Sequence, residues 1–201
     1  MYILLIVAVA AYLIGSINSS IIVGKLWGKI DIRNFGSGNA GATNTLRTLG
    51  IGPTILVIIG DALKGVIAIL IGWFLAKENG GLIAGLFAVV GHNWPVYFQF
   101  KGGKGILTSA FVILMVSPKE GGIAILIALA IMAITRYVSL GSVAAAALYP
   151  ILIGIMEAGK PNSRNLFIFA VLLAVLAIYR HRSNIKRLIN GTESKLGQKK
   201  A

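Results

Sequence analysis

The sequence contains no cysteine, only two histidines and only six acidic residues. Without cysteine the chain forms no disulfide and has no thiolate nucleophile. The scattered carboxylates and histidines offer no ligand cluster, so we expect neither a metal nor another cofactor. The spacing of serine, histidine and aspartate that an ordinary hydrolase needs is not legible either. These absences remove metal-dependent and thiol-dependent enzymes from the function classes to be considered.

Charged residues are scarce as well, at 12% of the chain against roughly 25% in soluble domains. Hydrophobic residues make up 57%, which indicates an integral membrane protein. We expect a single membrane domain over residues 1–201. The net charge of +13 favours anionic partners, either membrane lipid or phosphorylated substrates. We expect no nucleic-acid partner and no required protein partner.

Seven apolar segments follow one another and predict an all-α, polytopic membrane protein. Helices are expected because a lone strand cannot satisfy its backbone hydrogen bonds in lipid. The fourth and fifth segments are short and need flanking residues to cross. Five spans would also fit, if these two segments form one hairpin that dips in and back. The segments are residues 2–23, 51–75, 82–98, 106–116, 123–134, 138–156 and 166–179.

The basic residues are distributed unevenly over the polar gaps, and this predicts the orientation. Most lie in the first, third and fifth gaps and in the tail, which the positive-inside rule assigns to the cytoplasm. The N-terminus is then outside and the C-terminus cytoplasmic, which requires an odd number of spans. The cytoplasmic set is Lys25, Lys29, Arg33, Arg47, Lys101, Lys104, Arg136, Arg180, Arg182, Lys186, Arg187, Lys195, Lys199 and Lys200. The other gaps hold Lys77, Lys119, Lys160 and Arg164.

The third gap contains a glycine–lysine loop, made of Lys101, Gly102, Gly103, Lys104 and Gly105. Glycines let backbone N–H groups turn inward around an anion, and the two lysines add charge. The loop is not a Walker A motif, because glycine rather than serine or threonine follows the second lysine. A basic turn that only fixes the topology is the simpler alternative. The adjacent glycines favour phosphate binding.

A first glycine loop, residues 36–44, lies in the first gap and matches G-x-G-x-x-G. No strand precedes it, and Asp61, twenty residues on, lies inside an apolar segment, so a dinucleotide site is not supported. A flexible linker is the plainer alternative, but the region has more hydrogen-bond donors than a linker needs. The candidate phosphate ligands here are Ser37, Asn39, Thr43, Asn44 and Arg47.

Other polar residues near the predicted membrane segments admit structural as well as functional interpretations. Asp61 and Lys64 are three apart on one helix face, which favours a structural ion pair over substrate contact. His92 at the end of a span is interpreted as structural. A tail helix places His181 and Asn184 on one face, either at an active site or in a lipid-binding basic tail. Ser142, in a cytoplasmic gap, is a further candidate phosphate ligand.

Taken together, the motifs resemble the bacterial acyl-phosphate-dependent glycerol-3-phosphate acyltransferase family (PlsY type), over nearly the whole chain. One small departure is Leu107, where a small residue is expected before Thr108. The residues that carry the resemblance run from Gly36-Ser37-Gly38-Asn39 through Thr43-Asn44 to Arg47, then Asp61, Lys64-Gly65, Gly91-His92, Pro95, Phe100 to Gly105 and Thr108, and finally His181, Asn184-Ile185, Arg187-Leu188, Gly191 and Glu193.

The resemblance implies a seven-helix enzyme of the bacterial cytoplasmic (inner) membrane that acts in phospholipid synthesis. It would move a fatty acyl group from acyl phosphate to the sn-1 hydroxyl of glycerol 3-phosphate, giving lysophosphatidic acid and phosphate. The glycine–lysine loop would bind glycerol 3-phosphate, and the residues needed for activity would be Ser37, Arg47, His181 and Asn184. Glu193 would be structural.

Two other functions and one mechanistic question stay open. A membrane transporter of a phosphorylated metabolite would also need a basic polar site, although transporter sites lie near the bilayer midplane between repeated halves, and no repeat is seen here. A lipid-binding scaffold would need the basic tail but not two glycine loops. The general base is either His181 or a phosphate group of a substrate.

Overall fold

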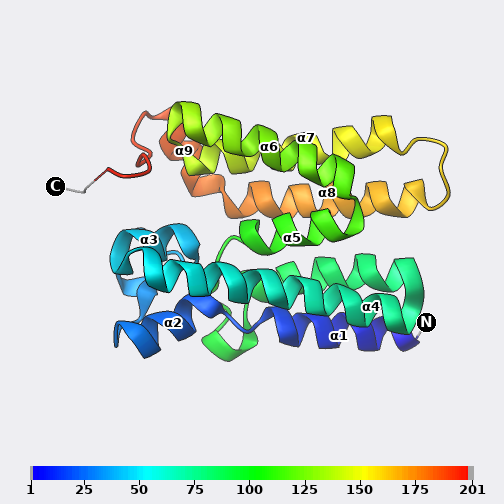
Figure 1. The fold of residues 1–201 in the computed structure, drawn as a ribbon, viewed down its shortest axis with the longest axis horizontal. Helices are drawn as coiled ribbons and strands as arrows, with labels where there is room; N and C mark the ends of the chain where they lie inside the picture. Colours follow the sequence, from blue (N-terminus) through cyan, green and yellow to red (C-terminus); the bar gives the residue numbers. More distant parts are fainter. Residues whose placement is uncertain (1, 199–201) are drawn as a thin grey trace. The chain divides into compact units, whose positions relative to one another are not determined.

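The computed structural model describes residues 2–198, in which every regular element is helical (Figure 1). Residues Lys199 and Lys200, which contribute to the charge argument, lie outside the described residues. The elements are α1 (Tyr2–Gly15), α2 (Ser19–Trp27), η1 (Ile32–Asn34), α3 (Ala42–Leu49), α4 (Ile51–Asn93), η2 (Val96–Phe98), α5 (Ile106–Val116), α6 (Pro118–Thr135), α7 (Val138–Met156), α8 (Ser163–Arg180) and α9 (Arg182–Ile189). The chain divides into two compact units, of which the first ends at Val116 and the second begins at Ser117, and each is described by itself below. The single domain over 1–201 stays a prediction.

The first apolar segment is not one continuous helix. Helix α1 ends at Gly15, and α2 begins at Ser19 after Asn18. The side-chain oxygen of Asn18 accepts a hydrogen bond from the backbone N–H of Ile21 at 3.1 Å, as the N-cap of α2. The sequence of this region is apolar enough to read as one 22-residue span, but a buried asparagine with capping geometry starts a second helix instead.

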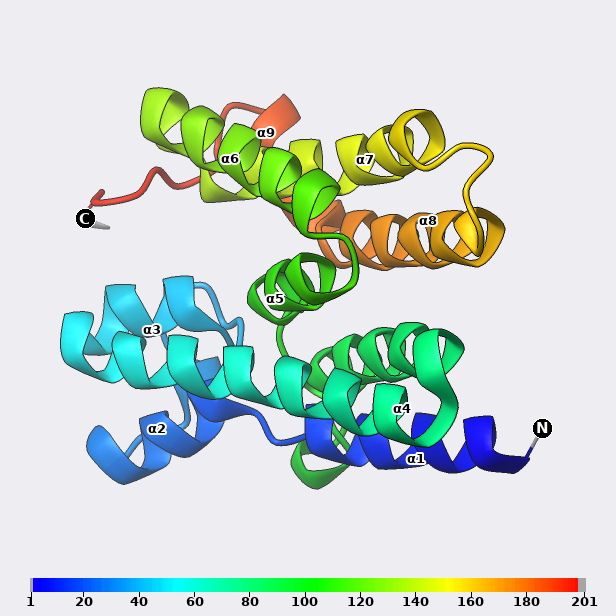
Figure 2. The ribbon, with the colours of Figure 1, turned by 45° about the vertical axis from the view of Figure 1, so that its right-hand side comes forward.

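Helix α4 is a helical hairpin. Ala76 and Lys77 have non-helical backbone angles, and the chain turns back there into a second arm that ends at Asn93 (Figures 1 and 2). The arms touch where Gly72 and Gly80 lie so close that a Cβ on either would collide with the other's carbonyl. The predicted segments 51–75 and 82–98 correspond to these two arms.

Small residues bring α1 close to α4 in the first unit. Val7 and Ala11 of α1 form a buried cluster with Ala68, Ala84 and Ala88 of α4. Such small side chains let helix backbones approach closely in a membrane, where packing rather than exclusion of water drives association. This packing fixes the second arm of α4, whose end leads through η2 to the glycine–lysine loop.

In the second unit, α7 packs against α6, α8 and α9. The buried hydroxyls of Ser117 and Tyr149 are hydrogen-bonded at 2.7 Å and join the start of α6 to α7. The predicted tail helix exists, but it is interrupted: α8 ends at Arg180, and His181 stands between α8 and α9.

Within residues 2–198, five helical stretches are long and apolar enough to cross a membrane. One of them, Ile51–Phe98, contains the α4 hairpin, and α5 is a shorter apolar helix. Many large apolar side chains are exposed along these helices, for example Phe74, Ile134 and Ile155, as expected for surfaces that face lipid.

Candidate functional site

The first glycine loop is shaped by the amide of Asn44, which is 1% exposed. Its oxygen accepts hydrogen bonds from the backbone N–H of Ser37 at 2.7 Å and from the Ser37 hydroxyl at 3.1 Å. Its nitrogen donates to the carbonyls of Ile32 and Phe35, both at 3.0 Å. Gly36 has a φ of 59°, a left-handed conformation that glycine adopts without strain. Asn44 therefore holds the loop closed, and its predicted contact with substrate stays a prediction.

Ser37 in this loop and Arg47 beyond it are both exposed residues. Arg47 lies on α3, directly after the loop. Asn39 and Thr43 are half-buried in the loop and at the start of α3. The Ser37 hydroxyl lies beside glycine backbone N–H groups, and the Arg47 guanidinium is carried by the helix that follows. Groups of these kinds can donate hydrogen bonds to an anionic oxygen.

The glycine–lysine loop passes over the buried ring of His92. The backbone N–H of Gly103 donates to the His92 carbonyl at 3.1 Å. A Cβ on Gly102 would collide with that carbonyl, and a Cβ on Gly103 would collide with His92 Nε2 and with the Ala40 carbonyl. No other residue type fits these two positions without a shift of the backbone. Lys101 is exposed and Lys104 half-buried, so the loop offers positive charge beside glycine backbone.

A buried charge cluster lies beneath this loop. Lys64 Nζ is 2.8 Å from Asp61 Oδ1, which confirms the predicted ion pair, and 2.7 Å from His92 Nδ1. It also donates to the Ile17 carbonyl at 3.0 Å. Because an ammonium group only donates, His92 Nδ1 accepts, and the ring proton lies on Nε2, the atom nearest Gly103. All three side chains are at most 4% exposed.

In the second unit, Glu193 gathers polar side chains around α9. Its Oε1 accepts hydrogen bonds from Asn184 Nδ2 at 2.7 Å and from the Ser139 hydroxyl at 2.8 Å. Its Oε2 accepts from Arg187 Nε at 2.6 Å. Burial alone would raise the pKa of Glu193, but these three hydrogen bonds outweigh it and hold the pKa below its ordinary value. Glu193 thus fixes the orientation of Asn184, in agreement with a structural role.

His181 is 3% exposed at the junction of α8 and α9. Its Nδ1 lies 2.8 Å from the Ala177 carbonyl, and a carbonyl only accepts, so Nδ1 carries a proton. In the neutral ring Nε2 is then the basic nitrogen. Asn184 lies one helical turn further along. Ser142 was predicted in a gap between helices, but it lies inside the first turns of α7. It is 4% exposed and its hydroxyl donates to the Val138 carbonyl of the same helix at 2.9 Å. Its contact with phosphate stays a prediction.

The predicted residues thus fall into two groups, one in each unit. The first unit holds both glycine loops with Ser37 and Arg47, and the second holds His181, Asn184 and Ser142. Sequence reasoning missed Arg33, which donates to the carbonyls of Phe98 and Lys101, and Asp31, which binds Arg33. The sequence feature that could have pointed to them is the Asp-x-Arg pair at residues 31–33, shortly before the first glycine loop. Among residues 2–198, no three His, Cys, Asp or Glu side chains are grouped to hold a metal ion.

Comparison with known proteins agrees with this arrangement of motifs. The family model described as glycerol-3-phosphate acyltransferase matches residues 5–191. A glycerol-3-phosphate acyltransferase of Thermoanaerobacter pseudethanolicus is 54% identical over 192 residues, covering 96% of this chain and 95% of the relative. One of Clostridioides difficile is 48% identical over 202 residues, covering 98% and 97%.

Two crystal structures of PlsY (YgiH), an integral membrane glycerol 3-phosphate acyltransferase, also resemble this chain. The glycerol 3-phosphate form has a TM-score of 0.87 at 40% identity and covers 96% of both chains. The lysophosphatidic acid form has a TM-score of 0.86 at 40% identity and covers 96% of this chain and 95% of the other. With the apolar helices described above, these findings make the chain a multi-pass membrane protein. It belongs to the glycerol-3-phosphate acyltransferase family.

Proposed function

We propose that this chain transfers a fatty acyl group from acyl phosphate to the sn-1 hydroxyl of glycerol 3-phosphate, releasing lysophosphatidic acid and phosphate. The observation that carries the acceptor and the product is the 40% identity, over 96% of the chain, to an enzyme whose two structures are its glycerol 3-phosphate and lysophosphatidic acid forms. The protein would act in the cytoplasmic membrane of a bacterium, where this transfer is the first step of phospholipid synthesis.

The proposal also specifies acyl phosphate as the donor of the acyl group. Acyl phosphate is an activated mixed anhydride, so the hydroxyl oxygen can attack its carbonyl carbon without a covalent enzyme intermediate. The carbon–oxygen bond to phosphate breaks, phosphate leaves with the electron pair, and the hydroxyl proton passes to a base. The protein then contributes orientation and charge stabilisation, which glycine loops with lysine and arginine can supply.

In this proposal the first unit binds the phosphate of glycerol 3-phosphate. The glycine–lysine loop packs closely on His92 and Ala40 because Gly102 and Gly103 have no side chain, and in this position Lys101 and Lys104 supply charge to the phosphate. Gly105, with a φ of 75°, ends the loop in a conformation that favours glycine. Ser37, Asn39, Thr43 and Arg47 contribute donors from the first glycine loop and α3.

The second unit supplies the residues for proton transfer and for the orientation of the reacting groups. His181 Nε2 is the basic nitrogen of a ring whose other nitrogen is held by the Ala177 carbonyl. That arrangement suits a general base, and Asn184, held by Glu193, suits a hydrogen bond to substrate. Ser142 is assigned to the donor phosphate. A substrate phosphate, with a second pKa near 6, is the alternative base.

The test of the reaction uses the purified protein with radiolabelled glycerol 3-phosphate and either acyl phosphate or acyl-CoA. We expect labelled lysophosphatidic acid with acyl phosphate and no added protein or cofactor. Product from acyl-CoA alone, with acyl phosphate inert, would contradict the donor. A stable acyl-serine on the protein would contradict direct transfer.

We also propose seven membrane crossings, with the N-terminus outside and both glycine loops and the C-terminus in the cytoplasm. The two arms of α4 and the five helices α1, α5, α6, α7 and α8 support this number, and the Lys/Arg distribution supports the orientation. Single cysteines at Ser37, Lys104 or Lys160 on the cysteine-free chain test it by labelling in intact cells. We expect impermeant reagents to reach only the cysteine at position 160 from outside.

A further inference from the structure

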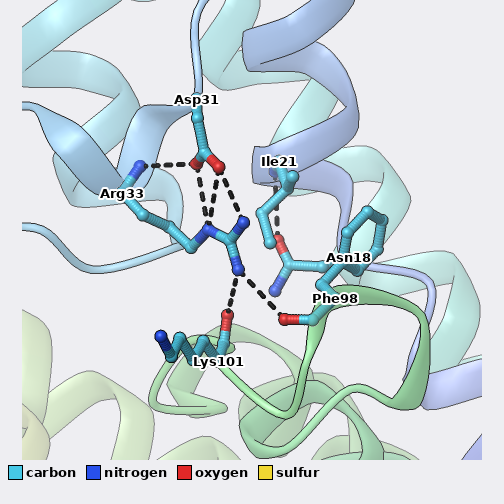
Figure 3. A network of polar contacts seen from close by, with 6 residues as sticks. All are labelled: Asn18, Ile21, Asp31, Arg33, Phe98 and Lys101. Carbon is cyan, nitrogen blue, oxygen red and sulfur yellow. Dashed lines mark hydrogen bonds and ion pairs between the residues drawn. The ribbon is translucent and has the colours of Figure 1, made fainter.

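Arg33 binds Asp31 through one edge of its guanidinium group. Its Nε lies 2.9 Å and 3.2 Å from the two carboxylate oxygens, and its Nη2 lies 2.6 Å from Oδ2 (Figure 3). The same carboxylate accepts the backbone N–H of Arg33 at 3.0 Å, as the N-cap of η1. The hydrogen bonds from Arg33 hold the pKa of Asp31 below its ordinary value, so the pair stays charged at neutral pH. The guanidinium is therefore fixed in one orientation.

The remaining edge of the guanidinium binds the first residue of the glycine–lysine loop and the chain that leads into it. Arg33 Nη1 donates to the carbonyl of Phe98 at 3.0 Å and to that of Lys101 at 3.3 Å (Figure 3). Between these carbonyls, Gln99 and Phe100 have φ values of 58° and 57°. This left-handed conformation is strained for a bulky residue such as phenylalanine and persists only where the surroundings impose it. Arg33 holds the backbone on both sides of the strained pair.

The short helix η1, which carries Arg33, also contacts the first glycine loop. Arg33 stands next to Ile32, whose carbonyl accepts from the Asn44 amide that also holds Ser37. Ile32 and Ala40 share a buried cluster against which Phe98 packs. The Ala40 carbonyl is also one of the atoms that a Cβ on Gly103 would strike, so the two loops touch.

We propose that Arg33, fixed by Asp31, is a positioning residue that couples the two glycine loops. Its role is to set where the N–H groups and lysines of the glycine–lysine loop stand relative to Ser37. Two carbonyls and a carboxylate need the planar guanidinium fork, and a lysine ammonium, as a single point of charge, cannot replace it. This inference rests on the proposed function for its kinetic consequence but not for its structural one.

The structural test measures amide hydrogen exchange of the segment 98–105 in the full-length protein in detergent. Arg33→Gln should speed exchange about tenfold there, because one charge-assisted contact to the loop is lost, while the melting temperature stays close to that of the parent chain. Arg33→Lys should restore little. Arg136→Gln is the matched control, because Arg136 also donates to a carbonyl, that of Leu196, but in the second unit.

The kinetic test measures the KM for glycerol 3-phosphate and for acyl phosphate. Arg33→Gln should raise the KM for glycerol 3-phosphate about tenfold and change the KM for acyl phosphate much less. Asp31→Asn should raise the KM for glycerol 3-phosphate by a smaller factor. The double variant should be no worse than Arg33→Gln alone, because both changes break one unit.

Unchanged exchange in Arg33→Gln would overturn the coupling. The coupling would also be overturned if the melting temperature fell and the KM values for both substrates rose equally. That result would mean that Arg33 only stabilises the fold. If Arg33→Gln does not fold, Asp31→Asn keeps the guanidinium and decides the question alone. If the parent chain transfers no acyl group, the proposed function fails, while the exchange result still tests the coupling.

Discussion

The residues predicted to act at the site are held by different contacts in the two units. In the first unit, charged side chains bind backbone carbonyls: Arg33 holds Phe98 and Lys101, and Lys64 holds Ile17. In the second, a carboxylate binds side chains, because Glu193 accepts from Asn184, Ser139 and Arg187. Bound carbonyls shape a loop whose lysines we propose to bind phosphate. Bound side chains orient individual reacting groups. Substitutions in the glycine–lysine loop of the first unit should therefore change KM, and substitutions of His181 or Asn184 in the second should change kcat.

The largest expected effect is in the second unit. His181→Ala should lower kcat by about 100- to 10,000-fold, the usual contribution of a general base, with little change in either KM or in thermal stability. Activity close to that of the parent chain would make a substrate phosphate the base and would end the assignment of proton transfer to this unit.

Lys104→Ala should act on binding. Loss of a charge-assisted hydrogen bond costs roughly 1.5–3 kcal/mol, so the KM for glycerol 3-phosphate should rise about ten- to a hundredfold. The KM for acyl phosphate should change much less. Lys119→Ala, which removes an exposed lysine of the second unit, is the control. A rise in the donor KM alone would assign the loop to acyl phosphate and move Ser37 and Arg47 to the acceptor.

Gly103→Ala separates backbone shape from charge, because both lysines remain. The new methyl group would collide with His92 Nε2 and the Ala40 carbonyl, so the loop must shift, and we expect the KM for glycerol 3-phosphate to rise about tenfold. The matched control is Gly122→Ala, since a Cβ at Gly122 in α6 meets nothing within 4 Å. Equal kinetics for the two variants would show that close backbone approach is not needed.

The smallest effect concerns the stability that Glu193 provides. Its pKa is lowered in the folded chain, so its contribution is present above the unfolded value of about 4.3 and is lost as pH falls through the folded value. Glu193→Gln should lower unfolding free energy by about 1.5 kcal/mol at pH 7 and flatten the loss of melting temperature in acid. Glu157→Gln is the control, because its partner Lys160 is exposed. An equal effect of both would remove the special role of Glu193.

The helices and the positions of the two glycine loops could be predicted from the sequence because both depend on local patterns. The segment 138–156 coincides with α7, and Asp61 and Lys64 pair because three residues separate them on a helix. The break after Gly15 could not be predicted, since the apolar run continues and only the buried Asn18 marks it. The contacts of Arg33 were out of reach for another reason. They join residues 65 and 68 positions apart, and no local pattern encodes them.

The buried cluster of Asp61, Lys64 and His92 has a consequence for how the chain enters the membrane during synthesis. An aspartate and a lysine at the centre of a lone helix each oppose insertion by roughly 2.5–3.5 kcal/mol. Asp61 lies on the same arm as Lys64, but the other two partners of Lys64 are in place only when His92, on the second arm of α4, and the Ile17 carbonyl at the break after α1 have joined it. The first arm of α4 is therefore a poor insertion substrate alone. It should leave the translocon together with its hairpin partner and the preceding helix, as one three-helix packet.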